Sequence, residues 1–343
     1  MDEATALRLL SLADDASEKL DEPGGNVWAD RLEQEHTHLQ EAFDWFTSQH
    51  RYAEALRLAA RLWTFQFDRG YADEGRRWLY SALEAPGTNA PTAVRATALY
   101  GAGTFAFRAL DQERAQRYFE ELLEVARAID DESFVGRGYG GLARLALRRG
   151  DTRETRRWST EAMELARRRG NEGETATPLH LLAAAARLDG KLDEARRLYR
   201  ENLELNQRLG HGVWVRNETL NLAAVEVLDG NPEGAVPRLR ESLRMARDST
   251  DRYLNPYILA WSARVALSRN DPGLAARLLA AAQAQSARNG LAMDPDEEPE
   301  FQKGVAICRS AMKVAEFQKH WDDGHRTSDE ESLALAERIL STS

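Results

Sequence analysis

The sequence predicts an all-α fold, a solenoid of stacked antiparallel helix pairs. The main observation is a small residue that recurs every 40 residues, at Gly75, Ala115, Thr155, Ala195, Ala235 and Ala275. A second series stands five residues before these, at Gly70, Leu110, Gly150, Gly190, Gly230 and Asn270, and a third twelve residues before, at Trp63, Gly103, Ala143, Ala183, Ala223 and Ala263. A fixed period of this length indicates one supersecondary unit stacked many times, and such stacks offer extended binding surfaces.

Each unit divides into two helical patterns joined by a tight turn. In one unit the patterns cover Thr175–Gly190 and Lys191–Gly210, with apolar residues at helical spacing in both. Gly190 is placed to end the first helix in the left-handed conformation. Pro232 and Pro272 stand where a second helix begins, a position that needs no N–H donor. The recurring small residue lets the two helices of a pair cross closely.

The N-terminal part is less regular, and we expect residues 1–50 to form capping helices. Residues 1–20 show one helical pattern, which Glu22-Pro23-Gly24-Gly25 interrupts. A second helix is predicted over Val27–Gln49 and a third over Tyr52–Arg69. The third opens the repeats, which we place at residues 51–290.

Residues 291–343 are predicted to form an acidic hinge followed by capping helices. The stretch Pro295-Asp296-Glu297-Glu298-Pro299 breaks the pattern, and two further helices are expected near Glu300–His320 and Ser328–Leu340. These helices do not keep the 40-residue phase, which is typical of the terminal units of a repeat array.

The composition and net charge of the chain limit the kinds of molecule that it is expected to bind. The chain has 343 residues, 43% hydrophobic and 30% charged, which fits a folded protein. Its net charge of −10 and pI near 5.4 disfavour broad attraction to nucleic acids or anionic membranes. We therefore expect neither nucleic acid nor membrane as a direct partner.

The single cysteine, Cys308, excludes an internal disulfide framework, and its expected state is a buried, inert thiol. The N-terminal residues are acidic where a signal peptide would be basic, and no apolar run of about 18 residues occurs. These features predict a cytoplasmic location.

The offsets within the repeat resemble those of tetratricopeptide (TPR) repeats in a longer form. The residues concerned are Leu142-Ala143, Gly150-Asp151 and Thr155, and then Leu182-Ala183, Gly190 and Ala195. A period of 40 alone would equally suit HEAT repeats, but the offsets favour TPR. The resemblance implies a right-handed superhelical solenoid of antiparallel helix pairs that binds protein partners.

A narrower resemblance lies outside the regular repeats. Segments 28–45, 55–63 and 69–79, together with the tail segments 276–282, 299–301 and 317–324, resemble the C-terminal TPR sensor arm of STAND, NB-ARC-type (LuxR-like) bacterial transcriptional regulators. In those proteins the arm follows an ATPase module. No Gly-x-x-x-x-Gly-Lys-Ser/Thr motif occurs here, so ATP hydrolysis cannot be carried over. The chain is then either an excised arm or a protein that keeps only the arm.

No catalytic constellation is evident, and we expect a protein that is not an enzyme and needs no cofactor or metal. Gly136-Arg-Gly138-Tyr-Gly-Gly141 matches a dinucleotide-binding pattern, but it falls inside a predicted helix, where glycines allow close packing. His36 and His38 point to different sides of a helix, so they do not form a metal pair. The acidic run Asp294–Glu300 lacks the ligand spacing of a calcium loop.

In TPR arrays the first helix of each unit faces the concave side. The repeat phase places eleven residues on that inner face: Tyr100, Thr104, Arg108, Arg137, Arg144, Arg148, His180, Arg187, Asn217, Tyr257 and Arg264. Six of these eleven residues are arginines and one is a histidine, in a protein with a net charge of −10. Because several guanidinium forks bind carboxylate or phosphate well, we hypothesise a groove for an acidic peptide or a small anionic ligand. The alternative is that each arginine pairs with an acid of the next unit and holds the stack.

These features favour a non-catalytic interaction module, the partner-sensing arm of a transcriptional regulator. The alternatives are a free-standing receptor for an anionic metabolite or nucleotide, and a free-standing TPR adaptor. End-to-end pairing of repeat arrays leaves a homodimer open.

Overall fold

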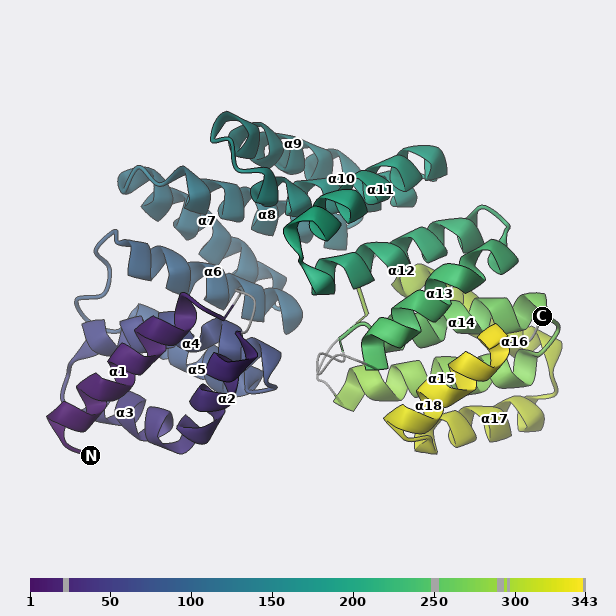
Figure 1. Cartoon of the computed structure of the whole chain (residues 1–343), viewed down its shortest axis with the longest axis horizontal. Coiled ribbons are helices and arrows are strands. Elements are labelled where there is room, and N and C mark those ends of the chain that lie inside the picture. Colours follow the sequence, from purple (N-terminus) through teal and green to yellow (C-terminus); the bar gives the residue numbers. More distant parts are fainter. Residues whose placement is uncertain (21–24, 248–252, 289–292, 295–296, 342–343) are drawn as a thin grey trace. The chain divides into compact units, whose positions relative to one another are not determined.

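The computed structural model describes residues 1–20, 25–247, 253–288, 293–294 and 297–341, and within them the chain is all-α (Figure 1). Helices make up 84% of the described residues, which contain no strand. The structure divides into two compact units, Met1–Leu145 and Ala146–Ser343, called unit 1 and unit 2 below. No helix in these ranges is both long and apolar enough to cross a bilayer.

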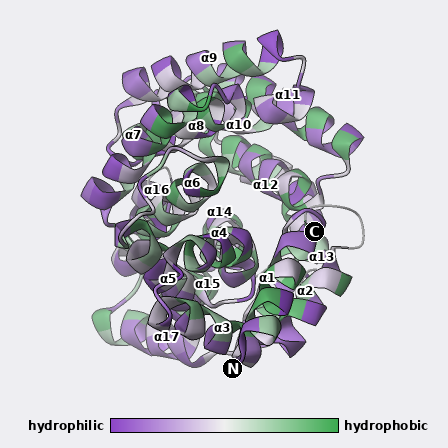
Figure 2. Ribbon diagram, turned by 90° about the vertical axis from the view of Figure 1, so that its left-hand side faces the viewer, coloured by the Kyte–Doolittle hydropathy of each residue, from purple (hydrophilic) through white to green (hydrophobic). Residues whose placement is uncertain are grey.

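Unit 1 is built of successive antiparallel helices: α1 (Glu3–Ser17), α2 (Asn26–Gln34), α3 (His36–Ser48), α4 (Tyr52–Asp68), α5 (Ala72–Glu84), α6 (Ala93–Arg108), α7 (Gln112–Ala128) and most of α8 (Glu132–Arg148). Neighbours in sequence pack side by side, as α4 does with α5 and α6 with α7. Apolar residues line the sides of helices that face other helices, while polar residues cover the outside (Figure 2).

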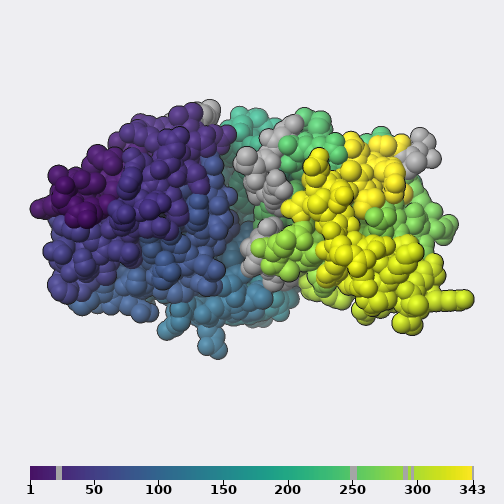
Figure 3. Space-filling view, turned by 90° about the horizontal axis from the view of Figure 1, so that it is seen from below, coloured from purple at the N-terminus to yellow at the C-terminus, as the bar shows by residue number. Residues whose placement is uncertain are grey.

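Unit 2 continues with the last turn of α8 and then α9 (Thr152–Arg168), the short 3-10 turn η1 (Glu172–Thr175), α10 (Ala176–Leu188), α11 (Leu192–Leu209), α12 (Gly212–Leu228), α13 (Pro232–Arg247), α14 (Asn255–Ser268), α15 (Pro272–Arg288), α16 (Glu298–Ala311), α17 (Val314–Arg326) and α18 (Asp329–Ser341). The last three helices share one apolar core with α14 and α15, to which Phe301, Phe317 and Leu340 contribute. Figure 3 shows these yellow C-terminal helices against the green helices of the same unit.

The three repeat series behave as the sequence predicts. The small residues Ala115, Thr155, Ala195, Ala235 and Ala275 are fully buried. All six residues of the turn series have positive φ angles, from 57° at Asn270 to 85° at Gly70. Left-handed backbone ends an α-helix at these points because it stops the i to i−4 hydrogen bonds, and glycine adopts it without steric cost. Pro232 and Pro272 begin α13 and α15.

The prediction of one helix over Val27–Gln49 is wrong, because α2 ends at Gln34 and α3 begins at His36. Glu35 lies between them with φ −96° and ψ 6°. Its carboxylate lies 2.8 Å from Nδ1 of His38 and 3.4 Å from Nη1 of Arg8, so ion pairs hold the bend. Of the preceding interruption, Glu22, Pro23 and Gly24 lie outside the described residues.

The prediction of one helix over Glu300–His320 is also wrong. Helix α16 ends at Ala311, and α17 begins at Val314 after two residues in extended conformation, Met312 and Lys313. The change of direction lets Phe317 join the core beside α15. The predicted helix Ser328–Leu340 corresponds to α18. Of the predicted break, Pro295 and Asp296 lie outside the described residues, and Pro299 lies in the first turn of α16.

Candidate functional site

In unit 1, three of the predicted inner-face residues form one cluster, called the Tyr100 cluster: Tyr100, Arg137 and Arg144. The guanidinium of Arg137 lies 5.7 Å from the ring centroid of Tyr100, in cation–π geometry. On its other side the ring of Tyr100 meets Trp63 edge-on, with 5.6 Å between centroids. Helix α8 therefore presents two cations to an aromatic platform made by α6 and α4.

The Tyr100 cluster carries a net positive charge. Burial raises the pKa of the Tyr100 hydroxyl, but the charge of Arg144, a hydrogen bond from Arg144 and the charge of Arg137 outweigh it, so the pKa is lowered overall. Within the residues that the structure describes, neither arginine forms an ion pair with a carboxylate. The cluster thus holds two positive charges beside a polarised hydroxyl, an arrangement suited to an anion.

The other two predicted residues of unit 1 are engaged locally. The hydroxyl of Thr104 donates to the carbonyl of Tyr100 at 2.9 Å, within its own helix. Arg108 lies over the ring of Phe67, 5.5 Å from its centroid. These contacts do not involve the Tyr100 ring or hydroxyl.

In unit 2, four predicted residues come together on an acidic segment from much later in the chain. Arg148 lies 3.6 Å from Asp294, Arg187 lies 2.7 Å from Glu297 and Arg264 lies 3.8 Å from Glu300. The Tyr257 hydroxyl donates to Oδ2 of Asp294 at 3.1 Å and accepts from the Asp294 backbone N–H at 3.2 Å. The three carboxylates Asp294, Glu297 and Glu300 are called the carboxylate row.

The basic side chains that bind the carboxylate row are withdrawn from solvent. Only 6% of the Arg148 side chain, 2% of the Arg187 side chain and 16% of the Arg264 side chain is exposed. They come from α8, α10 and α14, so residues far apart in sequence converge on one short segment. In a weakly solvated setting, charge pairing with a carboxylate offsets part of the cost of burying each guanidinium.

The remaining predicted residues of unit 2 lie elsewhere. Nδ1 of His180 lies 2.9 Å from Oε1 of Glu218 on α12, and this fully buried carboxylate also accepts from Asn202 at 3.0 Å. His180 therefore matches the alternative hypothesis, pairing between neighbouring helices of the stack. Asn217 is half-buried on α12.

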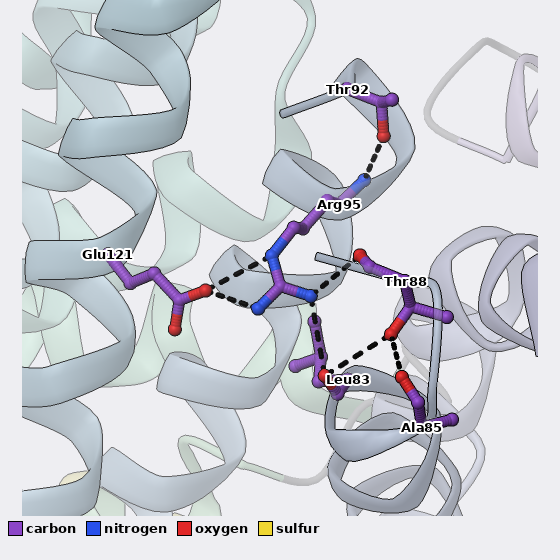
Figure 4. Close-up of polar contacts among 6 residues, drawn as sticks. All are labelled: Leu83, Ala85, Thr88, Thr92, Arg95 and Glu121. Carbon is purple, nitrogen blue, oxygen red and sulfur yellow. Dashed lines mark hydrogen bonds and ion pairs between the residues drawn. The ribbon is translucent and has the colours of Figure 1, made fainter. Parts of the chain in front are cut away.

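Arg95 in unit 1 shows what a purely structural arginine looks like in this fold (Figure 4). Its Nη1 donates to the backbone carbonyls of Thr88 at 2.8 Å and Leu83 at 3.3 Å, and its Nε donates to Glu121 of the next helix at 3.1 Å. Through these hydrogen bonds Arg95 connects the loop after α5 to α7. For Arg137 and Arg144, the part of the chain that the structure describes supplies contacts to Tyr100 but no carboxylate.

The glycine motif and Cys308 have structural roles. Residues 136–141 lie inside α8, and a Cβ on Gly141 would lie 2.5 Å from the Phe119 ring, so these glycines permit close helix contact. Cys308 is fully buried, which raises the pKa of its thiol to about 11. His36 and His38 pair with Glu74 and Glu35 respectively, and no cluster suited to a metal ion occurs in the described ranges.

Sequence reasoning missed that Asp294, Glu297 and Glu300 are partners of the predicted arginines. It predicted an acidic hinge, whereas Glu298 begins α16 and these three carboxylates form ion pairs. The signal was charge complementarity, since three carboxylates at three-residue spacing match a line of arginines. Sequence reasoning also missed Trp63 as the support of Tyr100.

The fold defines an all-α helical repeat protein. Residues 174–248 match the family described as tetratricopeptide repeat. A crystal structure of a tetratricopeptide repeat protein from Parabacteroides merdae ATCC 43184 is similar, with a TM-score of 0.53, 13% identity and coverage of 89% of this chain and 99% of that one. The apo form of RapI is similar with a TM-score of 0.50, 11% identity and coverage of 97% of both chains. No curated protein matches the sequence. Together these findings support a TPR repeat protein, and the structural likenesses concern the fold.

Proposed function

We propose that this protein is a non-catalytic interaction module whose Tyr100 cluster binds a carboxylate of an acidic peptide segment in a partner protein. The observation that carries the proposal is the convergence of Arg137 and Arg144 on Tyr100 without a carboxylate from the described residues. Guanidinium groups bind carboxylates through paired, charge-assisted hydrogen bonds, and the tyrosine hydroxyl supplies a further donor. TPR repeats as a class suggest protein binding.

The carboxylate row supports an acidic partner. Arg264, which stands three 40-residue periods after Arg144, lies 3.8 Å from the carboxylate of Glu300. The equivalent position in unit 1, Arg144, therefore favours an acidic peptide over an uncharged one.

The test is binding of a fluorescently labelled oligoglutamate peptide, with oligoglutamine as the neutral probe. The variant Arg137→Ala/Arg144→Ala should lose at least about tenfold in affinity, the equivalent of about 1.4 kcal/mol. The control, Arg117→Ala/Arg127→Ala, removes the same charge from exposed positions on α7 and should bind like the parent protein. Equal losses in both double variants would show nonspecific attraction and reject the site.

The same experiment distinguishes a small anionic ligand. If inorganic phosphate displaces the labelled peptide at low millimolar concentration, the Tyr100 cluster is a receptor site for a compact anion. If only other peptides displace the labelled peptide, the result supports an interaction module that binds a partner protein.

We further propose that the chain acts in the cytoplasm as the sensing arm of a multidomain regulator, with residues 1–50 and 291–343 flanking the repeats at 51–290. The resemblance of segments 28–45 and 69–79 to such arms supports this proposal. Immunoblotting of source cells tests it: a native product much larger than 38.6 kDa agrees with an arm, and one of that mass indicates a free-standing adaptor.

A further inference from the structure

In unit 2, basic side chains from three helices contact carboxylates of one later segment of the same chain. Three arginines and the hydroxyl of Tyr257 surround Asp294, Glu297 and Glu300, and Tyr253 also bonds to Asp294. These carboxylates belong to no repeat helix of the inner face. We propose that the carboxylate row is an internal pseudo-ligand, and that a partner peptide with the same three-residue spacing of carboxylates displaces it.

The geometry of the three ion pairs supports exchange. Only the pair Arg187–Glu297, at 2.7 Å, has the length of a charge-assisted hydrogen bond. The pairs Arg148–Asp294 at 3.6 Å and Arg264–Glu300 at 3.8 Å are longer than hydrogen bonds and retain mainly Coulomb attraction. A partner peptide that is free to adjust its backbone can shorten both, because it is not tied to α16.

The burial of the arginines explains why a ligand is needed at this face. Arg187 is almost completely removed from water, with 2% of its side chain exposed, and a buried guanidinium without an anion is costly. The internal carboxylates therefore stabilise the surface until a partner replaces them. The inference concerns a different cluster from the Tyr100 cluster and stands even if that cluster binds no peptide.

The test measures binding of a labelled synthetic peptide with the sequence of residues 293–304 to the full chain. The control peptide has each Asp and Glu replaced by Asn and Gln. The acidic peptide should bind to the variant Asp294→Asn/Glu297→Gln/Glu300→Gln at least about tenfold more tightly than to the parent chain. If the carboxylate row occupies the arginines of the parent chain about 90% of the time, this alone lowers the apparent affinity for the peptide about tenfold. Adding Arg187→Ala to that variant should abolish the gain.

Two results overturn the proposal: a triple variant that binds no more tightly than the parent chain, and a gain that survives Arg187→Ala. If the triple variant does not fold, hydrogen exchange on the parent chain decides. A saturating amount of the acidic peptide should speed backbone exchange in residues 297–304, while the neutral peptide should not. Unchanged exchange with both peptides would mean that the carboxylate row is a permanent structural contact.

Discussion

Arg187 of α10 forms an ion pair of 2.7 Å with Glu297, the residue that precedes α16, and both side chains are largely buried. The pair joins the repeat helices of unit 2 to the segment that leads into its last three helices. It is also the shortest of the three pairs of the carboxylate row, which makes it the best point for measuring what that row contributes.

We expect Arg187→Ala to lower the free energy of unfolding by about 3 kcal/mol, because it leaves a buried carboxylate without its partner. Urea denaturation followed by circular dichroism measures this. The control is Arg197→Ala, since Arg197 and Glu201 form an exposed i,i+4 pair whose side chains are 66% and 46% exposed. Such pairs contribute less than about 1 kcal/mol. Equal effects of the two substitutions would contradict the importance of burial here.

Gly141→Ala should destabilise unit 1 by about 1–3 kcal/mol, because the new Cβ would lie 2.5 Å from the Phe119 ring. Thermal unfolding measures the loss. Gly212→Ala is the matched control, since no atom lies within 4 Å of its Cβ position at the start of α12. That substitution should be neutral or slightly stabilising. Equal stabilities of the Gly141→Ala and Gly212→Ala proteins would contradict the close contact between α7 and α8.

Arg144→Ala should raise the pKa of Tyr100. In the parent protein, burial raises this pKa, while Arg144 and Arg137 lower it by more. Removal of the Arg144 charge leaves burial to dominate. Alkaline titration of absorbance at 295 nm measures the change, and subtraction of the Tyr100→Phe protein isolates the signal. An unchanged difference titration would mean that Arg144 does not face the hydroxyl.

Cys308 should make stability depend on pH in the alkaline range. Burial raises the pKa of its thiol from 9.0 to about 11 in the folded state, so the folded protein retains a proton that the unfolded chain releases. This contribution is complete below pH 9 and is lost as pH rises toward 11, with a slope of at most about 1.4 kcal/mol per pH unit. Urea denaturation of the parent and Cys308→Ala proteins across this range should show the steeper decline in the parent. Parallel declines would place the thiol in contact with water.

The fold was predictable to the extent that local signals mark it. Gly190 was expected to end its helix in the left-handed conformation, and all six residues of its series, from Gly70 to Asn270, have left-handed backbone. The breaks at Glu35 and at Met312 were not predicted, because the helical apolar pattern runs across them without glycine or proline. At the second break the packing of Phe317 into the core overrides the local pattern.

The candidate sites were predictable only in part. The phase of the repeat selected Arg148, Arg187, Tyr257 and Arg264 among eleven residues, and the structure brings these four to the carboxylate row. It also brings Tyr100, Arg137 and Arg144 together. The repeat phase also selected His180, but in the structure His180 pairs with Glu218 of α12 within the stack.

By itself, the sequence determined the helical repeat, its period and the residue types on the inner face, because these follow from spacing along one helix and from the conformations open to glycine, proline and small residues. Only the tertiary structure decided which acid meets which arginine. Arg187 and Glu297 lie on separate elements, and their pairing depends on how α10, α14 and α16 pack. Coulomb attraction acts through space, so charges distant in sequence become partners only when the core has fixed the helices that bear them.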